Sequence, residues 1–378
     1  MNGGWERRRG AARVLWVAVV VLTVADLSVF VARRDDAPGT DAAAVVRPLP
    51  AEETVPSRPT TTTRTPPATV AVAPPTTAPA RATVLKPRTT TTTRPAPRGV
   101  ASAATAPEGA WTLGPYRGVG VWLDVYDWTN ELTGGHPRVE LIDINRMAEH
   151  GIQTLYIQTG HRRSASDVIE PDRLRKLIDR AHAERMTVVA WYLPTFEDEN
   201  SDLRHLVAAS RLPVDGLGVD IESRAVPDHV ERNRRLLDLS ARLRQAVGRR
   251  ALAAITPDAV QLQVVNPAFW PSFPWRELAQ RYDAILPMAY WSVRSPAWRS
   301  GERYVAENID RIRASTGRPD VPIHVIGGIA DGATVADVQG MARVITARRI
   351  LGGSLYDWNT SQPAQWDALK PLRALRTG

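Results

Sequence analysis

The chain after residue 110 alternates short apolar runs with amphipathic segments, and the alternation repeats eight times. The apolar runs have the length of buried strands, which we predict at 118–125, 152–159, 186–193, 216–222, 251–256, 284–290, 323–329 and 353–357. Helical patterns follow them, with the clearest leucine spacing and first-turn prolines at 171–185, 227–247, 301–316, 334–349 and 363–375. Eight strand and helix pairs in succession predict a (β/α)8 TIM barrel.

Barrels of this kind carry their functional residues at the carboxyl ends of the strands. Here those ends hold many acids and indoles, whereas a purely structural barrel would favour the helix-capping residues Ser, Thr and Asn. The candidate binding residues at these ends are Asp124, Gln158, Trp191, Met288, Trp291, Asp357 and Trp358. The chain also has 12 tryptophans against 4 phenylalanines. An indole offers a flat apolar face to a sugar ring, so this balance points toward carbohydrate.

The fourth predicted strand ends in two acids, within the run Asp215-Gly-Leu-Gly-Val-Asp220-Ile-Glu222. Side chains alternate along a strand, so Asp220 and Glu222 point to the same side, about 7 Å apart. Two carboxylates on one face of an apolar strand are costly to bury, and they therefore indicate a polar pocket with catalytic chemistry. The alternative is that the pair caps the following helix or holds an arginine such as Arg224.

This run resembles the strand-four signature of family 18 glycoside hydrolases, the chitinase-like barrels, which reads DGxDxDxE. The phrase Met288-Ala-Tyr290 resembles the Met-x-Tyr-Asp of the family's sixth strand, and Trp358 corresponds to its tryptophan after the eighth strand. Two positions depart from the family pattern. Gly218 stands where the family has its inner aspartate, and Trp291 stands where the family has the aspartate after the tyrosine.

The resemblance implies a retaining glycosidase that cleaves an acetamido-sugar polymer of the cell envelope, such as peptidoglycan or an N-acetylglucosamine polymer. Glu222 would protonate the glycosidic oxygen while the substrate's own acetamido group attacks the anomeric carbon. Asp220 would hold the acetamide N–H, and Tyr290 would donate a hydrogen bond to its oxygen. A glycan-binding module without turnover is the alternative, since Gly218 removes an acid that tunes Asp220.

The strand ends are also similar to those of family 25 lysozymes. Those barrels carry an aspartate after strand one, an acid pair after strand four and an aspartate near strand eight. Asp124, Asp220, Glu222 and Asp357 would fill these places. A muramidase of that type is therefore a second alternative.

The first 110 residues have a different character. Residues 14–32 are almost continuously apolar and follow four arginines, which predicts a membrane-spanning signal anchor behind a cytoplasmic tail at 1–13. Cleavage after a shorter signal peptide, with secretion of the protein, is the alternative. Residues 33–110 are rich in Thr, Pro and Arg and predict a disordered linker. The barrel, at 111–378, is then expected outside the cytoplasm.

The distribution of charge argues against a nucleic-acid enzyme. Residues 1–107 hold 14 Lys and Arg against 7 Asp and Glu, whereas residues 108–378 hold 34 against 33. The predicted barrel is therefore nearly neutral, although a nucleic-acid surface would be basic. The chain has no cysteine, and its seven histidines show no metal-ligand spacing. We expect no metal and no cofactor, and the expected partners are an envelope glycan and the membrane.

Overall fold

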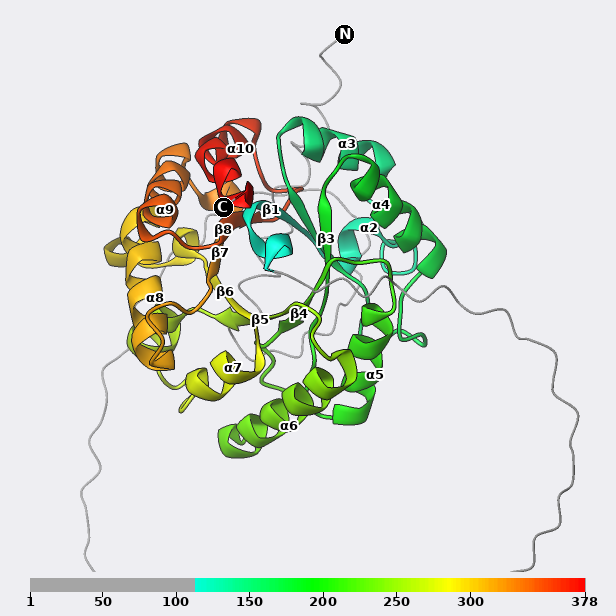
Figure 1. Ribbon diagram of the computed structural model, residues 1–378, viewed down its shortest axis with the longest axis horizontal. Helices are drawn as coiled ribbons and strands as arrows, with labels where there is room; N and C mark the ends of the chain where they lie inside the picture. Colours follow the sequence, from blue (N-terminus) through cyan, green and yellow to red (C-terminus); the bar gives the residue numbers. More distant parts are fainter. Residues whose placement is uncertain (1–112, 378) are drawn as a thin grey trace, which may run out of the picture. The chain divides into compact units, whose positions relative to one another are not determined.

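The computed structural model describes residues 113–377, which form a closed barrel of eight parallel strands inside a ring of helices (Figure 1). The strands are β1 (Gly118–Leu123), β2 (Thr154–Gln158), β3 (Thr187–Tyr192), β4 (Gly216–Asp220), β5 (Leu252–Pro257), β6 (Ala284–Ala289), β7 (His324–Gly328) and β8 (Gly352–Tyr356). Each strand pairs with the next one along the chain, and β8 pairs with β1. The predicted (β/α)8 barrel is confirmed.

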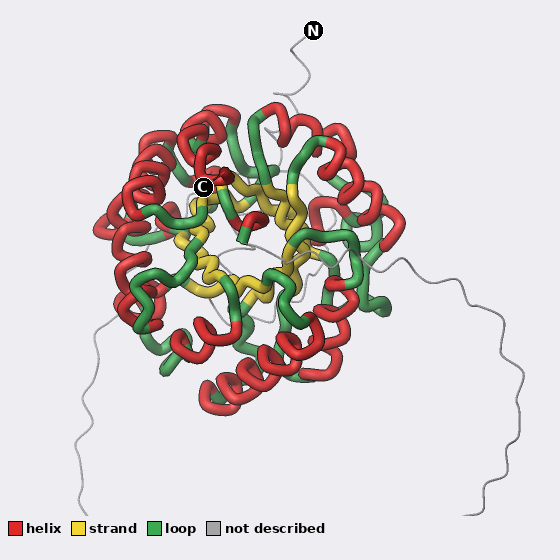
Figure 2. Tube along the Cα trace, in the orientation of Figure 1, coloured by secondary structure: helices red, strands yellow, loops and turns green. Residues whose placement is uncertain are grey.

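Helices follow the strands around the outside, as Figure 2 shows. The α-helices are α2 (Val125–Trp128), α3 (Leu141–Glu149), α4 (Pro171–Ala183), α5 (Glu199–Ser210), α6 (His229–Val247), α7 (Trp275–Arg281), α8 (Gly301–Thr316), α9 (Val335–Arg348) and α10 (Pro363–Ala368). Shorter turns of 3-10 or π type are η2 (Gly114–Tyr116), η3 (Gln261–Val265), η4 (Trp291–Val293), η5 (Pro296–Trp298), η6 (Ala330–Gly332) and η7 (Lys370–Thr377).

Strand side chains divide the core into two layers because they alternate between the two faces of the sheet. One apolar cluster fills the barrel and includes Trp122, Tyr156, Trp191 and Leu286. The other lies between the barrel and its helices, and Val121 of β1 belongs to it. Nearly every strand residue is buried, which explains why the strands read as continuous apolar runs in the sequence.

The N-terminal end of the barrel is closed by η2, drawn in cyan in Figure 1. Tyr116 is fully buried there, and its hydroxyl donates to the carbonyl oxygen of Leu217 at 2.7 Å. The ring of His324 lies 2.8 Å from the carbonyl oxygen of Tyr116. This plug leaves the carboxyl-terminal end, with its longer loops, as the end that can form a binding site.

Two predicted strands end two residues earlier than expected, whereas the ends of the other strands differ from the prediction by one residue. The strand predicted at 118–125 ends at Leu123 because Asp124 caps α2, its carboxylate accepting from the N–H of Tyr126 at 2.7 Å. The strand predicted at 216–222 ends at Asp220, so Glu222 lies on the loop just beyond it. Both differences bring acids out of the sheet and into the loops over the barrel.

The helix boundaries follow capping residues. The α4 and α10 helices begin at Pro171 and Pro363, as predicted, whereas α6 begins after Asp228, whose carboxylate accepts from the N–H two residues later at 2.8 Å. The helix predicted at 363–375 is divided into α10 and η7. Within residues 113–377, no helix combines the length and apolar character needed to cross a membrane. The predicted tail, anchor and linker lie outside the described residues.

Candidate active site

The acids that end β4 form the centre of the candidate site. Asp220 is only 6% exposed, and its Oδ1 has no hydrogen-bond partner among the described residues. Glu222 is half-buried, and burial raises its pKa to about 7. Burial and the neighbouring charge of Glu222 raise the pKa of Asp220 well above its usual range. The pair therefore retains a proton near neutral pH, as a general acid must.

The alternative that this pair holds an arginine is not supported. Among the ion pairs of the described barrel, none joins Arg224 to Asp220 or Glu222. The Arg224 guanidinium lies instead over the ring of Phe269, 5.1 Å from its centroid. Among the described residues, no ion pair joins either acid to a cation, and burial is the largest cause of the raised pKa of both.

Gly218 faces the barrel interior two residues before Asp220, level with Trp191 of β3. A Cβ at this glycine would lie 2.8 Å from Cδ1 of Ile255 and 3.3 Å from Cβ of Trp191. The space that an inner aspartate would need is therefore occupied by apolar atoms. This packing gives a physical reason for the glycine and leaves Asp220 next to hydrocarbon rather than next to a third carboxylate.

Tyr290 follows the end of β6 and reaches toward the same acids. Its side chain is half-buried, and burial raises its pKa well above the usual range, with further contributions from Glu222 and Asp220. Its hydroxyl thus stays protonated and can donate a hydrogen bond. Met288, two residues earlier, lies in the interior cluster below it. The ring of Tyr356, from the end of β8, is 6.1 Å from that of Tyr290.

A second group of acids lies at the ends of β1 and β8. Asp124, Asp127 and Asp357 are all buried, and one carboxylate oxygen from each lies within 4.8 Å of the others. Burial raises the pKa of all three, to about 7 for Asp357, and Asp124 adds to this at the other two. The hydroxyl of Tyr356 donates to Asp124 Oδ2 at 2.9 Å, and the Tyr356 ring lies 6.1 Å from the Tyr290 ring. The structure therefore brings Asp124 and Asp357 together, as their positions at strand ends suggested.

Asp127 and Tyr356 belong to this group although neither was predicted as a site residue. Alternation from Ser354, whose hydroxyl contacts Trp122 inside the barrel, would have placed the Tyr356 side chain inward. Asp127 gave a weaker signal, because its carboxylate serves the capping box of α2 by accepting from the Asp124 N–H at 2.9 Å.

Three clustered carboxylates are the usual ligands of hard cations such as Ca²⁺ or Mg²⁺. Here, however, five of their oxygens already accept hydrogen bonds from backbone N–H groups, Tyr356 and Asn359. The cluster is thus satisfied in large part by the protein itself. The prediction that the protein needs no metal stays a prediction.

Gln158 and Trp191 line the interior beneath the acids. Gln158 is 6% exposed, and its Oε1 accepts from the Val125 N–H at 3.1 Å, so it fixes the loop that carries Asp124. The Trp191 ring meets that of Trp122 edge-on at 5.8 Å, and its Nε1 has no hydrogen-bond partner among the described residues. Gln158 is therefore a supporting residue, whereas Trp191 offers a free donor at the floor of the site.

Two of the predicted sugar-binding residues lie in the outer layer of the core. Trp291 is fully buried, and its ring atoms lie within 3 Å of the position that a Cβ on Gly327 would take. Trp358 is 4% exposed and stacks on Trp366 of α10, with centroids 6.0 Å apart. Both indoles belong to the layer between barrel and helices. Both pack the core, and the prediction that they bind sugar stays a prediction.

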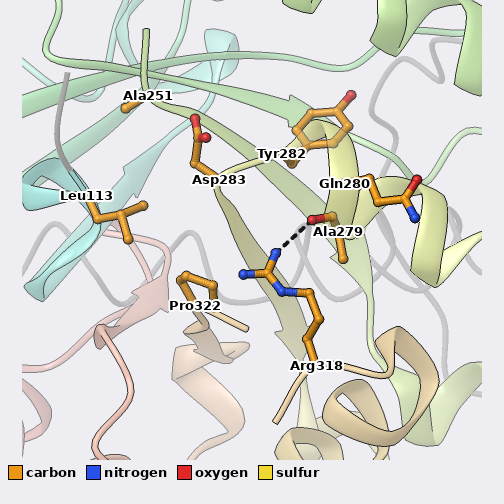
Figure 3. Close-up of a pocket in the computed structure, with 8 residues that line it drawn as sticks. All are labelled: Leu113, Ala251, Ala279, Gln280, Tyr282, Asp283, Arg318 and Pro322. Carbon is orange, nitrogen blue, oxygen red and sulfur yellow. Dashed lines mark hydrogen bonds between the residues drawn. The ribbon is translucent and has the colours of Figure 1, made fainter. Parts of the chain in front are cut away.

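A cavity of about 370 Å³ lies at the opposite end of the barrel, near the starts of β5 and β6 (Figure 3). It is lined by Leu113, Ala251, Ala279, Gln280, Tyr282, Asp283, Arg318 and Pro322. Its charged groups have partners, since Arg318 donates to the Ala279 carbonyl oxygen at 2.9 Å and Asp283 accepts from Arg244 at 2.9 Å. It contains none of the strand-end acids and is therefore not the candidate active site.

Comparison with known proteins supports the fold. No family model matches the chain, and no curated protein matches it in sequence. The C-terminal domain of a putative chitinase from Desulfitobacterium hafniense DCB-2 is similar to it with a TM-score of 0.50 and 9% identity, over 69% of this chain and 99% of that chain. The endo-1,4-beta-mannanase of Rhizomucor miehei is similar to it with a TM-score of 0.50 and 8% identity, over 69% of this chain and 95% of that chain. The spore cortex-lytic enzyme SleL of Bacillus cereus has a TM-score of 0.48 and 12% identity, over 68% of this chain and 74% of that chain.

At these identities the likeness establishes the barrel alone. The predicted resemblance to glycoside-hydrolase barrels is thus confirmed at the level of the fold. Membership of family 18 in particular stays a prediction.

Proposed function

We propose that the barrel is a glycosidase that hydrolyses an acetamido-sugar polymer of the cell envelope, with Glu222 as general acid. The observation that carries the proposal is the acid pair itself: Glu222 has a pKa of about 7, and beside it Asp220 holds a buried carboxyl oxygen without a partner. A proton donor near neutral pH next to an unoccupied acceptor matches what substrate-assisted hydrolysis requires. Because one barrel fold hosts many activities, the proposal depends on these residues and not on the architecture.

In the proposed reaction, Glu222 gives its proton to the glycosidic oxygen as the bond from that oxygen to the anomeric carbon breaks. The acetamido carbonyl oxygen of the same sugar forms a bond to the anomeric carbon, giving a cyclic oxazolinium ion, and the leaving sugar departs as an alcohol. Water then attacks the anomeric carbon while Glu222 takes its proton, so the ring opens and the configuration is retained.

Asp220, Tyr290 and Trp191 would hold the acetamido group during this step. The free Oδ1 of Asp220 is suited to accept its N–H, and the hydroxyl of Tyr290 to donate to its oxygen. The Trp191 indole N–H is a further buried donor without a partner among the described residues. Met288 contributes apolar surface beneath the sugar, and Asp124 and Asp357 would face the substrate from the opposite wall.

For localisation, we propose that residues 14–32 anchor the protein in the membrane and that residues 33–110 tether the barrel outside the cytoplasm. The apolar stretch, its preceding arginines and the Thr/Pro-rich composition support this arrangement. Secretion after signal cleavage is the alternative. Either placement would bring the barrel to an envelope glycan.

Two alternatives rest on specific observations. The apolar packing around Gly218 removes the acid that would tune Asp220, which favours a glycan-binding module with little or no turnover. The proximity of Asp124 to Asp357 favours a muramidase resembling family 25.

The test is to incubate the purified protein with peptidoglycan and with N-acetylglucosamine oligomers, and to identify the released ends by mass spectrometry. NMR of the first product formed would show whether the anomeric configuration is retained. Retained N-acetylglucosamine ends would support the proposal, and N-acetylmuramic acid ends would favour the muramidase. Binding without cleavage of either polymer would contradict catalysis and identify a binding module.

A further inference from the structure

Two arginines without acidic partners among the described residues lie on the loop and the helix that follow the acid pair. Arg224 follows Glu222 by two residues on the loop between β4 and α6, and Arg232 lies in the first turns of α6. The loop between β5 and α7 covers both with aromatic rings. The Arg232 guanidinium carbon is 4.1 Å from the centroid of Trp270, and that of Arg224 is 5.1 Å from the centroid of Phe269.

The Arg232 side chain is buried without a carboxylate partner among the described residues. Its side chain is 2% exposed, and its Nε has no hydrogen-bond partner among the described residues. No carboxylate of the described barrel forms an ion pair with it or with Arg224. Asp228 attracts it from farther away, but that carboxylate already accepts from the N–H of Val230 at 2.8 Å.

This arrangement costs stability, because a buried cation without a partner is unfavourable and a second cation beside it adds repulsion. Burial, followed by the charge of Arg224, lowers the pKa of Arg232 to about 10. The guanidinium thus remains charged at neutral pH. Trp270 holds it in place and is itself fixed, since its Nε1 donates to Asn233 at 2.7 Å. A charged, oriented and unpaired donor is characteristic of a site for an external anion.

We propose that Arg224 and Arg232 bind an oxyanion carried by the glycan, in a subsite on the loop that follows Glu222 and at the start of α6. The flat guanidinium group presents parallel N–H donors to a carboxylate or phosphate while its face stays on the aromatic ring. The inference rests on the proposed function and narrows its substrate class. The preferred polymer is anionic, with a carboxylate such as the lactyl group of N-acetylmuramic acid, or a phosphate, on the sugar that reaches this subsite.

Binding measurements on the full-length protein test the subsite in a Glu222→Gln background, which prevents turnover. Calorimetry would compare an oligosaccharide containing N-acetylmuramic acid with an N-acetylglucosamine oligomer of the same length, and with the first oligosaccharide after its carboxylate has been amidated. Inorganic phosphate forms a separate arm that distinguishes a phosphate source. The variants are Arg232→Met and Arg224→Gln, and the control is Arg249→Gln, an exposed arginine at the opposite end of the barrel.

We expect each site variant to weaken binding of the carboxylate-bearing oligosaccharide by on the order of tenfold or more, while binding of the neutral oligomer and the amidated form is unchanged. If phosphate is the natural group, inorganic phosphate binds more tightly than the carboxylate and loses affinity in the same variants. Arg249→Gln should change none of these affinities. Equal losses for neutral and anionic ligands, or no loss with either, would overturn the inference.

Thermal unfolding distinguishes an Arg232 that binds a ligand from one that only packs on Trp270. Removing a cation that is kept for an anion should leave the thermal midpoint of Arg232→Met equal to or above that of the parent. The anionic oligosaccharide should raise the midpoint of the parent and not of the variant. A variant that is less stable but binds the anion normally would contradict the subsite. Anion binding in the absence of any glycan cleavage would refute the proposed catalysis while leaving this subsite intact.

Discussion

The high pKa of Glu222 predicts a pH-dependent gain in stability when its charge is removed. A Glu pKa raised from 4.5 to about 7 means that the fold penalises the ionised form. The folded state then binds more protons than the unfolded state between these two values, so stability falls as the pH rises through this window. A shift of this size corresponds to about 3 kcal/mol. Above pH 7 the full penalty is present, and below 4.5 it is absent.

The variant Glu222→Gln should therefore be as stable as the parent at pH 4 and more stable at pH 8, by up to about 3 kcal/mol. Urea unfolding of both proteins across this range measures the difference directly. The comparison isolates Glu222 and its partner Asp220, because the other buried acids contribute equally to parent and variant. It needs no substrate, and it holds whether or not the protein is an enzyme.

Glu277→Gln is the matched control, since Glu277 is exposed on α7 and forms none of the side-chain ion pairs found in the described barrel. It should show no pH-dependent difference from the parent. If the stability gain of Glu222→Gln is the same at pH 4 and pH 8, Glu222 ionises freely in the folded protein. The assignment of this residue as a general acid near neutral pH would then fail.

Two further predictions concern the walls of the site. Tyr356→Phe removes the hydroxyl that donates to Asp124 and leaves a buried carboxyl oxygen without that partner. Urea unfolding at pH 7 should therefore show a loss of about 1–3 kcal/mol in the free energy of unfolding. An unchanged midpoint would mean that water replaces the hydroxyl. Gly218→Ala should cost about 1–3 kcal/mol because the new Cβ lies 2.8 Å from Cδ1 of Ile255. Adding Ile255→Val should recover part of that loss in a double-mutant cycle, and strictly additive effects would contradict the proposed clash.

The sequence was sufficient for the barrel because its strands are buried on both faces and its helices begin at proline or capping residues. The same alternation predicted that Asp220 and Glu222 lie near one another, and the charge of Glu222 does act on Asp220, although Glu222 lies on the loop beyond β4. Features that depend only on local periodicity were thus accessible without a structure.

The packing of Trp291 and Trp358 was not predicted from the local sequence pattern. Trp291 follows Tyr290 directly, and alternation alone would have turned it away from the acids once Tyr290 was assigned to the interior. The position of Trp358 depends on Trp366 in α10, a contact that local periodicity does not reveal. The absence of a partner for Arg232 likewise becomes visible only when the loops after β4 and β5 are seen together.

The most direct test of the central claim is the rate at which the parent protein and its Glu222→Gln variant release reducing ends from peptidoglycan and from N-acetylglucosamine oligomers, at pH 5.5 and pH 8.5. We predict release by the parent, faster at the lower pH because Glu222 must be protonated, and no release by the variant although it still binds the glycan. Equal release by parent and variant would contradict the account, since Glu222 would then have no part in the chemistry.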